Sequence, residues 1–224
     1  MIKFRIIICG WKTPADILTR CLNSIEMQDY PNKTITVSIG TDDSKRMYLV
    51  ENTFHTIYSL NLEPEDVLIL IDADDFLLDE NALKIISNEY ESDTDLLLTY
   101  GSYVNFSNNK RGKFNGEYLN GDNFRASPWR ASHLKTFKVK LWKCLPFSAL
   151  QHASGEWYKC CADRLIMIPL MEMAGYDRIK HIDWLLYCYD DTNPEGVWRT
   201  NKELSLKIRE SIEHKPSFQR IDNI

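Results

Sequence analysis

The sequence predicts an α/β protein with a mostly parallel sheet flanked by helices. Over the first hundred residues, short runs of β-branched and aliphatic residues alternate with segments of helical periodicity, which is typical of βαβ units with right-handed crossovers. The run "VLILI" at 67–71 is apolar without interruption, as expected for a strand covered on both faces. With 224 residues, 44% of them apolar, the chain is long enough to bury one sizeable core.

The strands are predicted from apolar runs that end at glycine or at polar residues. The first run ends at Gly10, and the second alternates before it ends at Gly40. The longer run after Asp95 has room for one or two strands. Strands are therefore expected at 4–9, 33–40, 66–71, 95–106 and 182–189.

The helices are predicted from apolar residues at helical spacing and from start signals. Leu18, Leu22 and Ile25 follow this spacing, and Asp79 can cap a helix that starts at Glu80. Helices are therefore expected at 15–28, 45–60, 80–90, 132–144, 162–174 and 202–213.

The alternation of strand and helix stops after residue 106. Residues 112–130 are polar, aromatic and rich in glycine and asparagine, which is typical of an ordered but irregular loop near a site. Turn signals predict further loops at 108–112 and 190–196.

Composition excludes some classes of function and location. The formal net charge of -5 argues against nucleic acid as the main partner, because phosphate binding favours a basic surface. No segment approaches the ~20 consecutive apolar residues of a membrane span, and the N-terminal apolar run is too short for a signal peptide. The six cysteines contain no CxxC pair, so we expect reduced thiols in a soluble, cytoplasmic protein without a transmembrane segment.

Three carboxylates follow the third predicted strand, in "LILIDADDF" at 68–76. In an open α/β sheet, ligands bind beyond the carboxyl ends of the strands, so Asp72, Asp74 and Asp75 are expected at that edge. Their mutual repulsion is relieved by a cation or by water, and hard dications with oxygen ligands suit such a cluster. The alternative is that these side chains cap a turn and bind loop amides.

Four strings in order along the chain resemble nucleotide-sugar-dependent glycosyltransferases of the GT-A fold, close to the large family 2 group. They are "CLNSIEMQDYPNKTITVSIGTDDS" from 21, "LILIDADDF" from 68, "PWRASHLKTFKVKLW" from 128 with "ADRLIMIPLMEMAG" from 162, and "LLYCYDDTNP" from 185. The resemblance implies one domain over 1–224 with a Rossmann-like sheet. Its parts are a nucleotide-binding half at 1–106, an acceptor-binding half at 107–200 and a C-terminal helix and tail at 201–224. The small size is similar to that of soluble bacterial glycan-assembly enzymes and of transferases from large algal viruses.

The resemblance implies a donor site for a nucleotide sugar, with a UDP-sugar favoured, and a Mn²⁺ or Mg²⁺ ion. The nucleoside would lie against Gly10 and Trp11 and against Asp42 and Asp43. The usual family string has a glycine before the serine, whereas Ser44 follows Asp43 directly, so which aspartate faces the base stays open.

In the DxD motif, the resemblance implies that Asp72, next to Ala73, reaches the ribose or the metal, and that Asp74 binds the metal directly. A metal there would stabilise charge on the donor diphosphate. Arg130 and His133 are candidates for contacting the diphosphate or for a late metal ligand. A packed or exposed histidine is the other interpretation of His133.

Asp163 stands where the family places its catalytic carboxylate, at the start of a helix. There it would take the proton of an acceptor hydroxyl on a glycan or glycoconjugate in an inverting transfer, and the helix N-terminus favours its ionised form. The alternative is a helix cap or an ion pair with Arg164. His152, Glu156 and Trp157 precede this helix and are candidates for shaping the acceptor site.

Other classes of function fit the sequence less well. A sugar nucleotidylyltransferase usually has a glycine-rich loop after its first strand, and "CGWKTPA" has a single glycine. A phosphatase with a DxDxT motif would need threonine near Phe76, and an EF-hand lacks its glycine and its twelfth-position glutamate here. A non-catalytic nucleotide-sugar-binding domain of the same fold remains the non-enzyme alternative.

Overall fold

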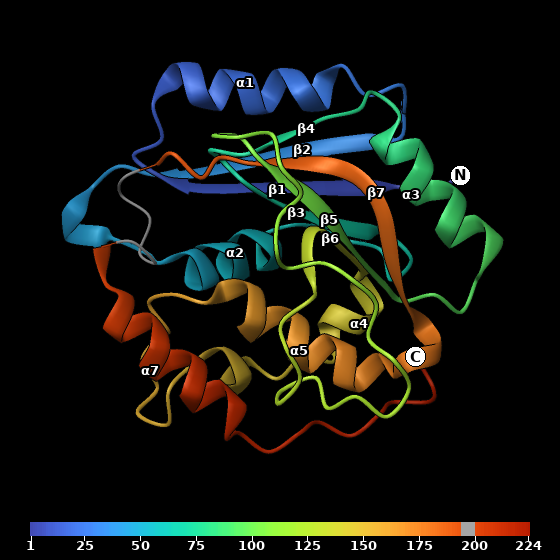
Figure 1. Cartoon of the computed structure of the whole chain (residues 1–224), viewed down its shortest axis with the longest axis vertical. Coiled ribbons are helices and arrows are strands. Elements are labelled where there is room, and N and C mark those ends of the chain that lie inside the picture. The colour runs from blue at the N-terminus through green and yellow to red at the C-terminus, as the bar shows by residue number, and fades with distance from the viewer. Residues whose placement is uncertain (194–199) are drawn as a thin grey trace.

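A single sheet forms the centre of the computed structural model, which describes residues 1–193 and 200–224 (Figure 1). Within these residues the sheet has seven strands in the order β2-β1-β3-β6-β5-β7-β4. The strands are β1 (Phe4–Trp11), β2 (Lys33–Gly40), β3 (Val67–Asp72), β4 (Phe76–Leu77), β5 (Leu98–Asn105), β6 (Ser132–Lys138) and β7 (Ile179–Tyr189).

Most strands of this sheet run in the same direction. β1 pairs in parallel with β2 and β3, and β5 pairs in parallel with β7. β6 lies antiparallel between β3 and β5, and β4 lies antiparallel to β7. Only β4 and β6 are therefore reversed among the described strands, and the predicted α/β class with a mostly parallel sheet is confirmed.

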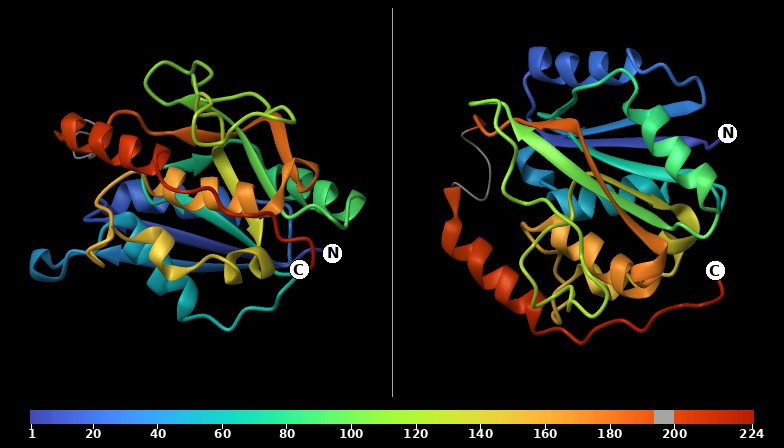
Figure 2. Two further views of the ribbon diagram at one scale, coloured as in Figure 1. Left: turned by 90° about the horizontal axis from the view of Figure 1, so that it is seen from below. Right: turned by 45° about the vertical axis from the view of Figure 1, so that its right-hand side comes forward.

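Helices cover both faces of the sheet. Figure 1 shows α1 and α3 on one side, with α2, α4, α5 and α7 on the other. The helices are α1 (Ala15–Glu26), α2 (Leu49–Tyr58), α3 (Ala82–Ser92), α4 (Val139–Lys143), α5 (Ala162–Ala174) and α7 (Lys202–Glu213). After α7, the C-terminal segment returns along α5, where Ile221 N donates to Met173 O at 2.9 Å (Figure 2).

The alternation of side chains along the central strands divides the core into two. Ile6 and Ile69 pack with α1 and α3, whereas Ile7 and Leu68 pack with α2 and α5. Successive residues of a strand point to opposite faces, so both faces of β1 and β3 are buried. This explains why the run at 67–71 has no polar residue.

Several helix boundaries agree with the sequence, and one prediction is wrong. The predicted strand at 33–40 and helices at 162–174 and 202–213 have the observed bounds. The predicted helix at 132–144 is instead β6 followed by the short helix α4. Because nearly every residue of β6 is buried, its apolar residues fall on both faces, and their spacing mimics that of a helix.

Smaller differences concern the edges of elements. The helix predicted at 45–60 begins at Leu49, and β5 is one strand. The two-residue strand β4 lacks any signal of its own in the sequence. The segment between β5 and β6 has turns and an isolated bridge between Val104 and Arg111, in agreement with an irregular loop. The turn predicted at 190–196 lies partly outside the described residues.

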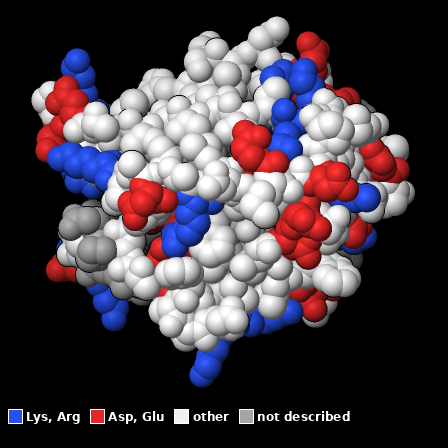
Figure 3. Space-filling view, turned by 90° about the horizontal axis from the view of Figure 1, so that it is seen from above, with Lys and Arg blue, Asp and Glu red and all other residues white. Residues whose placement is uncertain are grey.

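The surface carries charges of both signs. On the face over α1, acidic and basic side chains are interspersed among uncharged ones (Figure 3). Within residues 1–193 and 200–224, no helix has the length and apolar character needed to cross a membrane.

Candidate active site

The ends of β1, β2 and β3 bring the predicted donor-site residues to one edge of the sheet. In the parallel register, Trp11 pairs with Gly40 and Cys9 pairs with Asp72. A Cβ on Gly40 would lie 2.4 Å from the Trp11 ring, and a Cβ on Gly10 would lie 2.6 Å from Ala73 Cβ. Both glycines are therefore required by close packing at this edge.

The loop after β2 carries the two aspartates predicted to contact the nucleoside. Asp42 Oδ1 accepts hydrogen bonds from Ser44 N at 3.0 Å and Ser44 Oγ at 2.7 Å, and these bonds lower the pKa of Asp42. Asp43 pairs with Lys12 Nζ at 2.5 Å. Both carboxylates are exposed beside Trp11, so they are accessible to a ligand, and their roles remain predictions.

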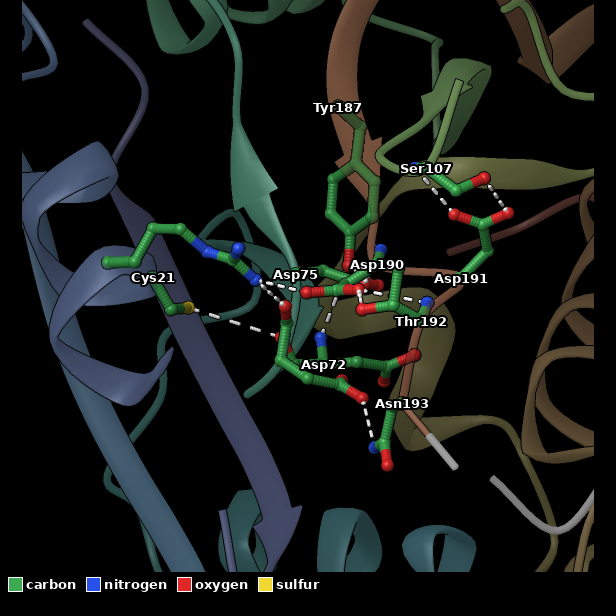
Figure 4. A network of polar contacts seen from close by, with 11 residues as sticks. Cys21, Asp72, Asp75, Ser107, Tyr187, Asp190, Asp191, Thr192 and Asn193 are labelled. Carbon is green, nitrogen blue, oxygen red and sulfur yellow. Dashed lines mark hydrogen bonds and ion pairs between the residues drawn. The ribbon is translucent and has the colours of Figure 1, made fainter. Parts of the chain in front are cut away.

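The acidic cluster after β3 is partly buried. Asp75 is fully buried; its Oδ2 accepts from Tyr187 Oη at 2.6 Å and its Oδ1 from Asp190 N at 2.7 Å (Figure 4). Burial, with repulsion from Asp72 and Asp74, raises the pKa of Asp75 well above its usual range. Burial is also the main cause that raises the pKa of Asp72 to about 6. A cation would remove both the repulsion and part of the desolvation cost.

A network from three elements fixes this cluster. Arg20 of α1 pairs with Asp190 Oδ2 at 2.5 Å and donates to Asp74 O at 2.8 Å. Its guanidinium lies 4.7 Å from the centres of the Phe76 and Phe106 rings. The two rings are 5.9 Å apart and nearly perpendicular, so the cation packs against both of them, and its hydrogen bond to Asp74 O holds the backbone of the acidic loop against α1.

Asp74, which we predicted as the direct metal ligand, accepts a hydrogen bond from a side-chain amide, and its role at the metal stays a prediction. Its Oδ2 accepts from Asn193 Nδ2 at 2.7 Å. Among the described residues, Asp72, Asp75 and His133 form a group whose ligand atoms all lie within 4.8 Å of one another. The structure thus brings two predicted site residues, Asp72 and His133, together with Asp75, which sequence reasoning placed in the acidic cluster but not among the ligands.

His133 of β6 is packed in an aromatic stack. Its ring centre lies 4.4 Å from that of Tyr187, with 9° between the ring planes, and 6.0 Å from the ring centre of Tyr103 in an edge-to-face arrangement. Burial lowers the pKa of His133 well below its ordinary value, so the imidazole is neutral and able to bind a metal. His133 Nδ1 is buried and has no hydrogen-bond partner among the described residues. An orphaned imidazole nitrogen beside two carboxylates fits a dication.

Asp163 lies in the first turn of α5, close to the acidic cluster. Asp72 and Asp163 line a small cavity of about 20 Å³ together with Lys135, and repulsion from Asp163 contributes to the raised pKa of Asp72. The N-cap of α5 is Cys161, and Arg164 pairs with Glu213 at 3.4 Å. Asp163 is therefore not the N-cap residue, and the ion pair of Arg164 is with Glu213. Burial lowers the pKa of Arg164, and the charge of Asp163 opposes this shift.

Lys135 is a member of the site that sequence reasoning missed. It is buried on β6, opposite Leu70 of β3, and its charge lowers the pKa of Asp72. The string "SHLKTF" at 132–137 has only two apolar residues, so the sequence gives no signal that this lysine is buried, although buried lysines are rare in proteins.

Two other groups of predicted residues have local partners. Arg130 pairs with Asp122 at 2.7 Å and stacks on Tyr118 at 5.3 Å, so these contacts hold it within the irregular segment. The His152 ring lies 3.7 Å from that of Tyr158, and Trp157 packs against other aromatic rings. Glu156 is exposed nearby. The role of these three residues at the acceptor site stays a prediction.

Comparison with known proteins identifies the fold. No family model and no curated protein matches the sequence. Among solved structures, S. aureus TarS matches with a TM-score of 0.61 and 13% identity over 92% of this chain and 40% of that one. Residues 1–349 of TarS in complex with UDP-GlcNAc match with a TM-score of 0.61 and 12% identity, over 92% of this chain and 66% of that one.

A third match is the mannosyltransferase PcManGT from Pyrobaculum calidifontis in complex with GDP-Man and Mn²⁺. Its TM-score is 0.58 with 12% identity, over 96% of this chain and 66% of that one. The chain thus spans 40% to 66% of the lengths of these proteins. These likenesses confirm the predicted fold class: the chain has the fold of GT-A-type glycosyltransferases.

Proposed function

We propose that the chain is a metal-dependent glycosyltransferase that moves a sugar from a nucleotide sugar to a hydroxyl of a glycan or glycoconjugate. The observation that carries this proposal is that Asp72 and Asp163 line the same cavity. Asp72 also belongs to the candidate metal group with Asp75 and His133. A metal-binding group and a carboxylate base within reach of each other are the two parts that glycosyl transfer from a diphosphate requires.

The metal would be held by Asp72, Asp75 and His133, and we favour Mn²⁺ over Mg²⁺ because the structurally similar PcManGT is in complex with Mn²⁺. When bound, the ion would stabilise negative charge on the diphosphate leaving group. Asp74 and its partner Asn193 lie beside this group and would then orient the donor.

Asp163 would act as the base of an inverting transfer. It would accept the proton of the acceptor hydroxyl while that oxygen bonds to the anomeric carbon and the nucleoside diphosphate leaves with the electrons of the broken bond. The N-terminus of α5 favours the ionised carboxylate that this step needs.

The donor would bind in the half formed by residues 1–106, and the acceptor in the half formed by residues 107–200. Trp11, Gly10 and the Asp42–Asp43 loop would contact the nucleoside at the edge of the sheet. The complexes with UDP-GlcNAc and GDP-Man support a nucleotide sugar as donor, and we favour a UDP-sugar.

The first test is a panel of nucleotide sugars in a thermal-shift assay with Mn²⁺ and with a chelator. A donor should raise the melting temperature by several degrees in Mn²⁺ only, because a ligand that binds only the native state stabilises it by RT ln(1 + L/Kd), where L is the free concentration of the ligand. If no nucleotide sugar stabilises the protein in Mn²⁺, the proposal fails. Slow release of the free sugar from the donor identifies an enzyme, whereas a pure binding domain protects it.

The second test addresses the base. Asp163→Asn should retain donor binding and reduce transfer or donor hydrolysis by about 10²–10⁴-fold, the usual contribution of a general base. Asp16→Asn, in the first turn of α1, is the matched control and should retain activity. Near-normal turnover by Asp163→Asn would show that the base is another group.

A further inference from the structure

Two adjacent thiols lie at the start of α5, outside the acidic cluster. Cys160 Sγ and Cys161 Sγ are 3.6 Å apart, and both residues are half-buried, whereas Cys9, Cys21 and Cys188 are buried. Cys161 has a left-handed backbone with φ 62°. This conformation is uncommon for a residue other than glycine. With it, the sulfurs of these two adjacent residues lie on the same side of the chain, in contact with each other.

The sulfur pair also contacts α7. Cys161 Sγ lies 3.7 Å from Ser205 O of α7. This contact limits the orientations that the two sulfurs can adopt.

A disulfide between these residues is disfavoured by their adjacency. The peptide bond between them is trans, so their Cα atoms are about 3.8 Å apart, below the separation of about 4.4–6.8 Å that disulfides usually adopt. The pair is better suited to share one ion. With metal–sulfur bonds of about 2.3 Å, a sulfur separation of 3.6 Å gives a sulfur–metal–sulfur angle of about 103°, which is close to tetrahedral.

We propose that Cys160 and Cys161 form a two-thiolate site for a thiophilic divalent cation such as Zn²⁺, separate from the Asp72, Asp75 and His133 cluster. Binding replaces the two thiol protons, which are released to solvent, by two metal–sulfur bonds. Two protein ligands leave the remaining positions to water, so the ion exchanges readily, unlike the closed four-ligand sites that stabilise folds.

The two cysteines precede Asp163 by three and two residues, and we infer from this proximity a regulatory role that rests on the proposed function. A dication on the sulfurs would attract the Asp163 carboxylate, which already interacts electrostatically with both thiols. The bound ion would compete with the acceptor hydroxyl for that carboxylate. Thiophilic ions should therefore inhibit transfer without displacing the donor.

The test of the site uses Cd²⁺ titrated into the whole reduced protein with saturating Mn²⁺, followed by the ultraviolet absorption of cadmium–thiolate bonds. This absorption does not report carboxylate or imidazole binding. One equivalent of Cd²⁺ should bind, and Zn²⁺ should compete for it. Cys160→Ser and Cys161→Ser should each weaken binding by at least about tenfold, since even outer-shell partners contribute that much at metal sites.

Cys144→Ser is the matched control, because Cys144 is the other half-buried cysteine and should leave the titration unchanged. Circular dichroism shows whether each variant is folded. Wild-type affinity in either vicinal variant, or loss of binding in Cys144→Ser, would overturn the site. In a transfer assay, inhibition by stoichiometric Zn²⁺ should disappear in both vicinal variants. Cadmium–thiolate absorption without inhibition would keep the site and overturn its regulatory role.

Discussion

Tyr187 of β7 donates a 2.6 Å hydrogen bond to the buried carboxylate of Asp75, and the face of its ring stacks on His133 at 4.4 Å. One side chain thus supports two members of the candidate metal group, Asp75 through its hydroxyl and His133 through the face of its ring. β7, near the end of the chain, thereby orients Asp75, which follows β3, and His133, which belongs to β6.

Removing this hydroxyl should weaken both the fold and the metal site. Tyr187→Phe keeps the stacked ring but leaves Asp75 with one donor fewer, so we expect a loss of about 1–3 kcal/mol in unfolding free energy. The hydrogen bond from Tyr187 also lowers the pKa of Asp75, so the variant should bind Mn²⁺ more weakly at neutral pH. Denaturant unfolding with a chelator and Mn²⁺ titration measure the two effects.

Tyr58→Phe provides the control for this substitution, because Tyr58 is 81% exposed and its change should stay within about 0.5 kcal/mol. Equal stability and equal Mn²⁺ affinity in Tyr187→Phe and the wild type would contradict the supporting role of the phenol.

Asp72→Asn should stabilise the metal-free protein at neutral pH. The pKa of Asp72 is raised to about 6 in the folded state, against about 3.9 in an unfolded chain. The folded state therefore binds the proton more tightly, and the stability contributed by this group is present below pH ~4 and lost as the pH rises through ~6.

With a chelator present, the stability difference between Asp72→Asn and the wild type should widen from pH 4 to pH 6 and then stay constant. Urea unfolding over this range measures it. Adding Mn²⁺ at pH 7.5 should stabilise the wild type more than the variant. If the stability difference between Asp72→Asn and the wild type does not change with pH, the pKa of Asp72 is not raised in the folded protein.

His133→Phe should separate stacking from metal binding. Phenylalanine keeps a flat ring against Tyr187 but has no nitrogen, so Mn²⁺ affinity should fall at least about tenfold, as for other metal-site substitutions. Stability in chelator should be retained, because the substitution also removes a buried nitrogen without a partner. Isothermal titration with Mn²⁺ is the measurement, and His214→Ala, on an exposed residue after α7, is its control. Unchanged Mn²⁺ affinity would exclude His133 as a ligand.

Gly40→Ala should disturb the predicted nucleoside contact. The added methyl would lie 2.4 Å from the Trp11 ring, so the ring must shift, at a cost of about 1–3 kcal/mol for such overpacking. If Trp11 contacts the nucleoside, donor affinity should fall while Mn²⁺ affinity is retained. Val37→Ala, at an exposed position of the same strand, controls for the loss of strand stability. Donor affinity equal to that of the wild type would remove Trp11 from the donor site.

The sequence alone predicted the elements whose signals are local. The uninterrupted run of β3 indicated burial on both faces, and the helical spacing of α5 and α7 gave their observed bounds. It also placed the acidic residues at the carboxyl edge of a sheet, because strand direction and loop position follow from the alternation of elements. Asp163 was predicted by resemblance to a family motif, and the structure places it at the cavity with Asp72.

Only the tertiary structure decided which of these side chains meet. A strand buried on both faces carries no alternating pattern, so the sequence of β6 looks helical. Only the structure shows that β6 lies between β3 and β5. Asp75 rather than Asp74 joins Asp72 and His133 because the turn after β3 and the Tyr187 and Asp190 donors direct its carboxylate inward. Such contacts join residues more than a hundred positions apart, and their geometry depends on the packing of the whole sheet rather than on the spacing of residues along the chain.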